Sequence, residues 1–209
     1  MNKLRRTTAG LVAALAASAT ALTALPAEAA QGNRSIAKVL AADGNRFDRN
    51  WDDFDITEKA VLAVLKAKPD SAVKLLTQGS KRATVFVPTD RAFRILVGDL
   101  TGKRPGTEAK TFKAVAGLGV DTIEAVLLYH VVAGKTLVSE KVVAADGSFV
   151  RTAAGTTFKV VVGHEGVVRI RDKDYNAENA EAIPRLLDIN RGNKQVAHGI
   201  DRVLRPVDL

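Results

Sequence analysis

The sequence predicts an α+β fold in which several helices flank a wedge of mainly antiparallel β-strands. Segments with apolar residues at helical spacing fill most of the first half of the chain, up to about residue 130. Short segments rich in Val, Phe and Thr follow from Lys141 onward. Because the two kinds of segment do not alternate strictly, a sheet built from parallel βαβ units is disfavoured.

The N-terminal residues match a secretory signal peptide. A positively charged start at residues 3–6 precedes an Ala-, Leu- and Val-rich stretch at 9–25 and a small-residue cleavage pattern at 27–29. The apolar stretch is short and weakly hydrophobic for a bilayer core of about 30 Å, which disfavours a membrane anchor. We therefore expect cleavage after Ala29 and a secreted, extracellular protein, while the two adjacent arginines leave the twin-arginine export route open.

Cleavage leaves a short polar segment at residues 30–35 and one domain at 36–209. The whole chain carries a formal charge of +8, and removal of residues 1–29, with three positive charges and one negative charge, leaves +6. A basic balance favours acidic partners such as anionic envelope polymers. Nucleic acid is disfavoured, since basic residues are scattered and aromatic residues are few. The absence of cysteine excludes disulfides and thiol chemistry.

The first elements are expected to be two helices. The segment TEKAVLAVLKAK, at residues 57–68, places Val61, Val64 and Leu65 on one face, and Pro69 ends it. Ser71 is positioned to cap a second, short helix.

A strand, a turn and a helix are expected next. Residues 84–87 form a short strand that Pro88 stops, and Thr89 or Asp90 is the N-cap of a helix that carries Phe93. Residues 98–108, rich in Gly, Thr and charge, are predicted to be a loop.

Two further helices are expected before the strands. A short one spans Ala109–Ala116 and is closed by Gly117. Another begins at Asp121, which with Glu124 has the form of a capping box. Its buried stripe follows helical spacing and comprises Ile123, Val126, Leu127 and His130.

The second half of the chain predicts a β-meander. The segments SFVRT, TTFKVVV and VVRIR are short strands joined by turns with the sequences Ala-Ala-Gly and Gly-His-Glu-Gly. The segment QVAHGIDRVL is a further strand, which ends before Pro206.

No catalytic constellation is visible in the sequence. No serine lies in a G-x-S-x-G elbow. His130, His164 and His198 lie on three different predicted elements, and the start of an H-E-x-x-H motif at His164 fails because Val168 stands where the second histidine is needed. We therefore expect no catalytic residue and no zinc site.

A calcium loop is also disfavoured. Asp172, Asp174 and Asn176 match the start of such a loop, but Ala177 stands where the sharp turn needs glycine and Ile183 where a bidentate glutamate is needed.

The acidic stretch 43–55 fails the same test. It is predicted to be a polar surface loop that encloses Trp51 and Phe54. No pair of carboxylates elsewhere is marked by the sequence as a buried acid–base couple.

Three blocks, in order, resemble the motifs of the fasciclin domain. They are TVFVPTDRAF at 84–93, Leu-Tyr-His-Val-Val at 128–132 and NKQVAHGIDRVLRP at 193–206. The resemblance covers residues 36–209 and implies a compact wedge of β-strands flanked by helices.

The resemblance also implies roles for individual residues. The Tyr-His motif, which that family uses for fold integrity and for partner contacts, corresponds to Tyr129 and His130. The positions that carry the family's structural motifs are Thr84, Pro88, Thr89, Asp90, Phe93, His198 and Asp201. Helical phase favours a buried, hydrogen-bonded His130, whereas Tyr129 lies off the stripe and is expected to present its ring outward as an interface anchor.

The sequence departs from the family pattern in three places. These are the segment 98–108, the acidic and Asn-rich insert 172–181, and Gly199, where a bulky apolar residue is usual. The first two extend the exposed surface and are candidates for partner specificity.

The leading functional hypothesis is therefore a non-catalytic extracellular module for cell adhesion or for association with the matrix or envelope. Its expected partner is an extracellular protein or an anionic envelope polymer, with no nucleic acid, cofactor or metal. The alternatives are a carrier of a small apolar ligand, such as a lipid or pigment, and an uncharacterised hydrolase.

Overall fold

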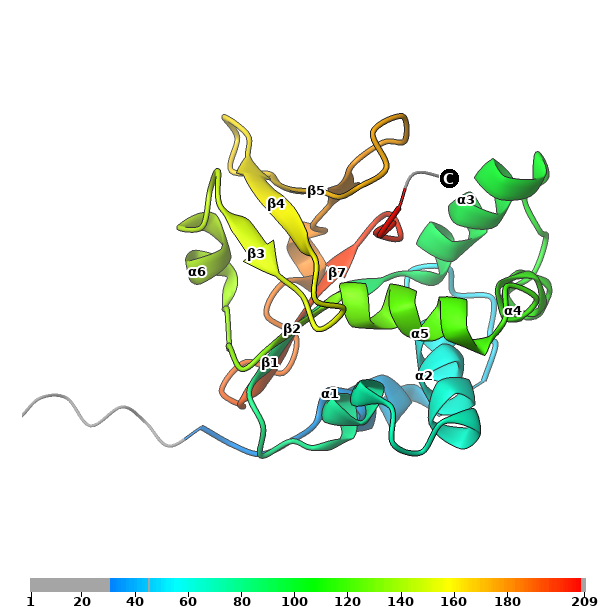
Figure 1. Cartoon of the computed structure of the whole chain (residues 1–209), viewed down its shortest axis with the longest axis horizontal. Helices are drawn as coiled ribbons and strands as arrows, with labels where there is room; N and C mark the ends of the chain where they lie inside the picture. Colours follow the sequence, from blue (N-terminus) through cyan, green and yellow to red (C-terminus); the bar gives the residue numbers. More distant parts are fainter. Residues whose placement is uncertain (1–30, 45, 208–209) are drawn as a thin grey trace, which may run out of the picture. The chain divides into compact units, whose positions relative to one another are not determined.

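The computed structural model describes residues 31–44 and 46–207. The predicted signal peptide and its cleavage site lie outside these residues. Residues from Gln31 onward form one compact unit. The unit combines helices with two β-sheets of mainly antiparallel strands, and the predicted α+β class is confirmed (Figure 1).

The helices α1 to α5 cluster around one side of the central strands, whereas the short helix α6 lies on the other side, beside β3 (Phe149–Arg151) (Figure 1). In chain order they are α1 (Ile36–Leu40), α2 (Asp55–Ala67), α3 (Asp90–Thr101), α4 (Glu108–Ala116), α5 (Val120–Tyr129) and α6 (Ser139–Val143), with 3₁₀ turns η1 (Ala41–Asp43), η2 (Ala72–Thr77) and η3 (Pro184–Leu186). None of the helices in the described part of the chain has the length and apolar character needed to cross a bilayer.

The first sheet is mixed and has the order β2-β1-β7, with β1 at Ala83–Pro88, β2 at Val131–Ala133 and β7 at Gln195–Ile200. The strand β2 pairs with β1 antiparallel, whereas β7 pairs with β1 in parallel, with Phe86 opposite His198. All six residues of β1 and all six of β7 are buried, as expected for strands covered on both faces. The first and last sequence motifs therefore lie side by side.

The second sheet is the predicted β-meander. Its antiparallel strands are β3 (Phe149–Arg151), β4 (Thr157–Val162), β5 (Val168–Arg171) and β6 (Ala180–Glu181), in that order. Phe158 and Val160 of β4 and Val168 and Ile170 of β5 are buried, and Val160 stands opposite Ile170. One face of this sheet thus supplies an apolar layer.

Two apolar clusters form the interior. One lies among the helices and one face of β1, and includes Ile56, Val64 and Phe93. The other lies between the two sheets, where the rings of Phe86 and Phe158 meet edge to face at 5.3 Å. The helix α2 contributes its predicted stripe to the first cluster and ends two residues before Pro69.

The predicted loop 98–108 is shorter in the structure. The helix α3 continues through Gly98 to Thr101 and ends at Gly102, which adopts the left-handed conformation (φ 72°) that glycine tolerates best. The helix α4 then begins at Glu108, with the Thr107 side chain as its N-cap. Only residues 102–107 connect the two helices.

The capping box predicted at Asp121 is wrong. The N-cap of α5 is Gly119, and Asp121 lies inside the first turn. The carboxylates of Asp121 and Glu124 instead form ion pairs with Lys68, just after α2. The pairing residue lies more than 50 positions away and overrides the local pattern.

The sequence pattern missed two short helices, α1 and α6. The N-cap of α1 is Ser35, whose hydroxyl accepts a hydrogen bond from the N–H of Lys38. The polar residues before it are part of the same compact unit, because the backbone of Gly32 bonds to both Gly192 and Lys194.

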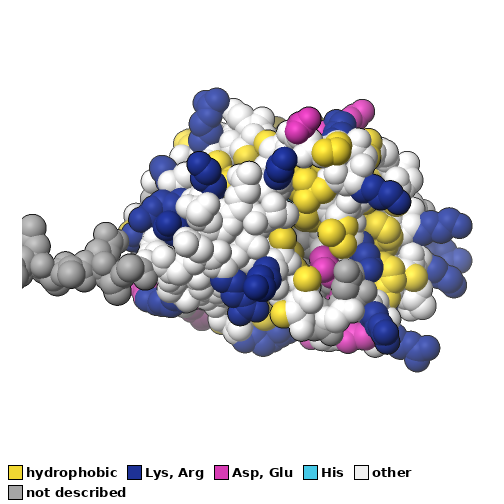
Figure 2. Space-filling view, turned by 90° about the horizontal axis from the view of Figure 1, so that it is seen from below, with side chains coloured by type: hydrophobic (Ala, Val, Ile, Leu, Met, Phe, Trp, Pro, Cys, Tyr) yellow, Lys and Arg dark blue, Asp and Glu magenta, His cyan; other side chains and the backbone are white. Residues whose placement is uncertain are grey.

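Figure 2 shows that Lys and Arg side chains are spread over one face of the compact unit, between acidic and hydrophobic side chains, and form no continuous stripe there. Two of the exposed hydrophobic residues, Leu62 and Leu118, belong to the helical side. Single exposed apolar residues are normal on a protein surface.

Candidate functional site

The first motif ties β1 to the segment after β2. Thr84 is fully buried, and its hydroxyl donates a hydrogen bond to the carbonyl of Lys135 at 2.9 Å. The same oxygen accepts a hydrogen bond from the N–H of Leu137 at 2.8 Å. The two hydrogen bonds offset the cost of removing this hydroxyl from water.

The turn after β1 is held by two further side chains. The carbonyl of Pro88 accepts a hydrogen bond from the Thr57 hydroxyl of α2 at 3.1 Å. Thr89, not Asp90, is the N-cap of α3, since its hydroxyl accepts a hydrogen bond from the N–H of Ala92 at 3.3 Å. Pro88 and Thr89 therefore fix the direction in which α3 leaves the sheet.

Asp90 and Phe93 join α3 to the interior. Phe93 is buried in the helical cluster. Oδ1 of Asp90 accepts a hydrogen bond from the N–H of Ile56 at 2.9 Å, which links the starts of α3 and α2. Burial raises the pKa of Asp90 to about 9, against the opposing effect of this hydrogen bond.

Tyr129 is fully buried, so the expectation that its ring points outward is wrong. It is the last residue of α5, and the chain turns from there into β2, so helical phase no longer decides where its side chain lies. The ring packs edge to face on Phe158 at 6.3 Å, and the hydroxyl donates a hydrogen bond to the carbonyl of Thr157 at 3.1 Å. The side chain cannot touch a partner in this structure.

His130 is buried and bonded through both ring nitrogens. Nδ1 lies 2.7 Å from the carbonyl of Val126, and Nε2 accepts a hydrogen bond from the N–H of Leu204 at 2.8 Å. The neutral tautomer with its proton on Nδ1 satisfies both contacts. Burial lowers the pKa of His130 to about 4.

The closing motif makes comparable contacts. Nε2 of His198 donates to the carbonyl of Leu137 at 2.8 Å, and Nδ1 accepts from the N–H of Asp188 at 3.3 Å. Burial lowers the pKa of this histidine as well. Oδ1 of Asp201 accepts from the N–H of Glu181 at 2.7 Å. Both histidines thus hold interior elements together, while Asp201 is half-exposed and ties the segment after β7 to β6.

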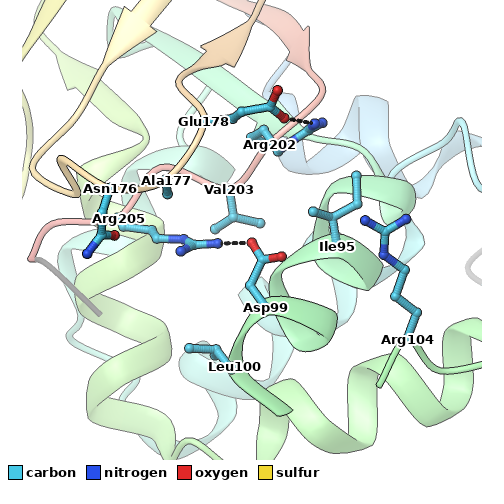
Figure 3. Close-up of a pocket in the computed structure, with 10 residues that line it drawn as sticks. All are labelled: Ile95, Asp99, Leu100, Arg104, Asn176, Ala177, Glu178, Arg202, Val203 and Arg205. Carbon is cyan, nitrogen blue, oxygen red and sulfur yellow. Dashed lines mark hydrogen bonds and ion pairs between the residues drawn. The ribbon is translucent and has the colours of Figure 1, made fainter. Parts of the chain in front are cut away.

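A surface groove of about 500 Å³ lies beside α3 (Figure 3). One wall comes from α3 and the loop after it, and the other from the insert 172–181 and the segment after β7. Its lining consists of Ile95, Asp99, Leu100, Arg104, Asn176, Ala177, Glu178, Arg202, Val203 and Arg205. Two segments that depart from the family pattern, 98–108 and 172–181, therefore meet at one site.

Arg205 organises the wall formed by the insert. It is mostly buried, and its guanidinium pairs with Asp174 at 2.8 Å and with Asp99 of α3. The backbone N–H of Arg205 also donates a hydrogen bond to Oδ2 of Asp172 at 2.7 Å. The two aspartates that resemble the start of a calcium loop thus bind an arginine, which fixes the insert against α3.

The other two arginines of the groove are more accessible. Arg202 pairs with Glu178, whose side chain is 79% exposed, and with Asp201. Arg104 is exposed and follows the end of α3 (Figure 3). An exposed ion pair contributes only about 0–1 kcal/mol. An incoming anion can therefore replace Glu178 as the partner of Arg202 at little cost.

Tyr175 is the candidate binding residue that sequence reasoning missed. It lies in the insert, directly before Asn176 of the groove wall, and is 81% exposed. An exposed tyrosine combines a large apolar ring with a polar tip, which suits an interface. The available signal was a single aromatic residue inside the otherwise polar run DKDYNAEN.

Two apolar cavities lie in the helical cluster, one beside His130 and one beside Leu118. Their volumes are about 20 Å³ and 30 Å³. Pockets for drug-sized ligands have roughly 300–1,000 Å³, so neither cavity accommodates a lipid or a pigment.

Potential metal ligands also gather near the start of α2. Oxygen atoms of Asp53, Asp55 and Asp90 lie within 4.8 Å of one another, as do those of Asp48, Asp55 and Glu108. The prediction that 43–55 is a polar surface loop is therefore wrong at its end. Asp55 is buried because it is the first residue of α2 and enters the helical interior.

No curated protein sequence matches this chain. A solved structure of a FAS1 domain pair from the insect cell adhesion molecule Fasciclin I matches with a TM-score of 0.56 and 17% sequence identity. The alignment covers 82% of this chain and 50% of that one, so this chain spans about half the length of the pair. The sequence profile of the fasciclin domain matches residues 59–206, more than half of the chain. The chain therefore belongs to the fasciclin domain family.

Proposed function

We propose that the protein is a secreted, non-catalytic adhesion module that binds an anionic polymer of the cell envelope or matrix through the groove beside α3. The observation that carries the proposal is the meeting of the segments 98–108 and 172–181 in one groove with three arginines. Family membership supports a binding module, and the two segments extend the surface on which specificity usually lies.

The charge of the groove favours an anionic partner. Arg202 and Arg205 are each paired with two carboxylates, whereas Arg104 has no ion pair among the described residues and is open to an incoming anion. The guanidinium group offers paired N–H donors that match carboxylates, phosphates and sulfates. The exposed ring of Tyr175 adds a stacking surface for a sugar or a peptide next to these donors.

The histidines support a non-catalytic role. Both nitrogens of His130 and of His198 are bonded to backbone groups in the interior. His164 is exposed and lies in the turn before β5. A general base needs access to a substrate, which His130 and His198 do not have.

Binding of the purified protein to isolated envelope fractions and to an immobilised polyuronate tests the proposal, with neutral dextran as the reference surface. We expect Arg104→Gln and Arg202→Gln to weaken binding while the melting temperature stays within a few degrees of the wild type. Arg151→Gln is the matched control, because Arg151 is an exposed arginine of β3 outside the groove. Binding only to a protease-sensitive component would identify an extracellular protein as the partner, and the polymer assignment would then be wrong.

A further inference from the structure

Three helices begin with a carboxylate, and the three carboxylates are buried. Asp55 is the first residue of α2, Asp90 of α3 and Glu108 of α4. Their exposed fractions are 3%, 0% and 2%. Carboxylates at helix starts are common on a surface, where water and the helix dipole stabilise them. Here the three helix starts meet in the interior.

The oxygens of this cluster are spaced for a metal ion. Asp55 is shared by two groups, one with Asp53 and Asp90 and the other with Asp48 and Glu108. Within each group the ligand oxygens lie no more than 4.8 Å apart. Calcium binds oxygen at roughly 2.3–2.6 Å, so two oxygens bound to one ion are separated by at most about 5 Å.

Two oxygens of the cluster are buried without a hydrogen-bond donor. Oδ1 of Asp90 accepts from the N–H of Ile56, but Oδ2 has no hydrogen-bond partner. Oε2 of Glu108 accepts from the N–H of Arg49 at 3.0 Å, but Oε1 has none. Buried carboxylate oxygens are normally satisfied by hydrogen bonds, cationic groups or metals. Such oxygens in two carboxylate groups that share Asp55 are consistent with a cation bound beside Asp55.

The helix starts and the neighbouring carboxylates act on the charge of the cluster in opposite directions. Each helix start supplies a partial positive charge of roughly one half, which acts within the first turn. The pKa of Asp90 is nevertheless raised, mainly by burial and further by the charges of Asp53, Asp55 and Glu108. Four carboxylates therefore remain close enough to disfavour one another's ionisation.

We propose that this cluster is a divalent-cation site for calcium, with Asp53, Asp55, Asp90 and Glu108 as ligands. Calcium accepts six to eight oxygen ligands in irregular geometry, which suits carboxylates from one loop and three helix starts. Magnesium demands near-ideal octahedral geometry and keeps several waters, which a buried cluster does not readily supply. The bound ion would clamp the starts of α2, α3 and α4, and so stabilise the helical side that supports the groove.

Thermal unfolding of the purified chain in calcium, in magnesium and in a chelator tests this site. We expect calcium at about 100 times its Kd to raise the melting temperature by roughly 5–10 °C over the chelated protein. In Asp90→Asn the side-chain oxygen can still accept from Ile56, so the chelated variant should melt at or above the wild-type temperature and lose the calcium shift. Glu108→Gln should also lose most of the calcium shift, because the substitution removes a carboxylate charge from the proposed site.

The matched control is Asp70→Asn, which removes an exposed carboxylate in the turn after α2. It should keep the full calcium shift, and isothermal titration of the wild type should give one calcium per chain. Absence of a shift and of binding heat in the wild type at millimolar calcium would overturn the proposal and leave Asp90 holding a proton in place of an ion. A shift of equal size in Asp90→Asn would overturn it as well.

Discussion

The ring nitrogen Nε2 of His130 accepts a hydrogen bond from the backbone N–H of Leu204, 2.8 Å away in space and 74 residues later in the chain. The bond joins the end of α5 to the segment that follows β7 and leads into the groove wall at Arg205. The Tyr-His motif therefore has a structural role in this protein, because His130 holds the segment that precedes Arg205.

The contribution of His130 to stability should fall in mild acid, whereas Asp90, with its raised pKa, contributes in the opposite direction. Its pKa in the folded protein is about 4, below the ordinary value of 6.5, since burial disfavours the charged ring. Between these two values the ring of His130 binds a proton in the unfolded chain but not in the folded chain, so its contribution to the free energy of unfolding decreases as the pH falls. The loss should approach about 3 kcal/mol once the pH is below the folded pKa. Urea unfolding at a series of pH values between 7 and 4 measures the free energy of unfolding, and comparison with a His130 variant isolates the contribution of this residue.

The variant His130→Gln supplies the control for this pH dependence. It should be less stable than the wild type at pH 7 but should lose less stability between pH 6.5 and 4. His198, with its lowered pKa, contributes in the same direction and Asp90, with its raised pKa, in the opposite one, so the residual slope of the variant is the sum of these two contributions. An unchanged slope in His130→Gln would contradict the assignment.

Substitutions of Tyr129 should lower stability more as more of the buried side chain is removed. Tyr129→Phe deletes only the hydrogen bond to Thr157 and should cost about 1 kcal/mol. Tyr129→Ala deletes a fully buried ring and should cost roughly 3–5 kcal/mol. Chemical denaturation measures both changes. Binding should survive in Tyr129→Phe, and a well-folded Tyr129→Phe that no longer binds would show that the hydroxyl is part of the partner site.

Tyr175→Ala should leave stability unchanged but weaken binding, the reverse of what is expected for Tyr129→Phe. The side chain is 81% exposed, so its removal should change the free energy of unfolding by less than about 0.5 kcal/mol. Binding to envelope fractions should weaken severalfold, because an exposed aromatic beside the groove is removed. The informative comparison is Phe149→Ala, which removes another exposed aromatic, on β3. Equal weakening in both variants would indicate nonspecific hydrophobic adsorption.

Gly199→Ala should destabilise the fold by roughly 1–3 kcal/mol. A Cβ at this position of β7 would lie 2.6 Å from Cβ of Leu186, so η3 would have to move away from the strand. This close contact gives a physical reason for glycine where the family usually has a bulky residue. Gly106→Ala, with nothing within 4 Å of its added Cβ, should be close to neutral in the same denaturation assay. A neutral Gly199→Ala would show that η3 moves at little cost.

Local sequence patterns correctly predicted the elements in which residues at regular spacing face the same interior. The strand at Thr84–Val87 and the buried stripe through Ile123, Leu127 and His130 were correct because each residue faces the same interior as its periodic neighbours. Tyr129 failed because it stands where a helix changes into a strand.

Contacts between distant segments could not be read from the sequence. The parallel pairing of β1 with β7 joins residues more than 100 positions apart, and the pairing of Lys68 with Asp121 replaced a predicted cap. The buried cluster at Asp55, Asp90 and Glu108 arises because three helix starts converge, although each residue alone resembles an ordinary first-turn carboxylate. The groove depends on the same kind of convergence.

The most direct test of the account is the salt dependence of binding to the immobilised polyuronate for the wild type, Arg104→Gln and Arg151→Gln. If the groove is the binding site, Arg104→Gln should bind more weakly and should reduce the slope of log Kd against log salt concentration, whereas Arg151→Gln should match the wild type. If the two variants lose affinity equally, binding follows the net charge of the protein, and the groove beside α3 is not the site.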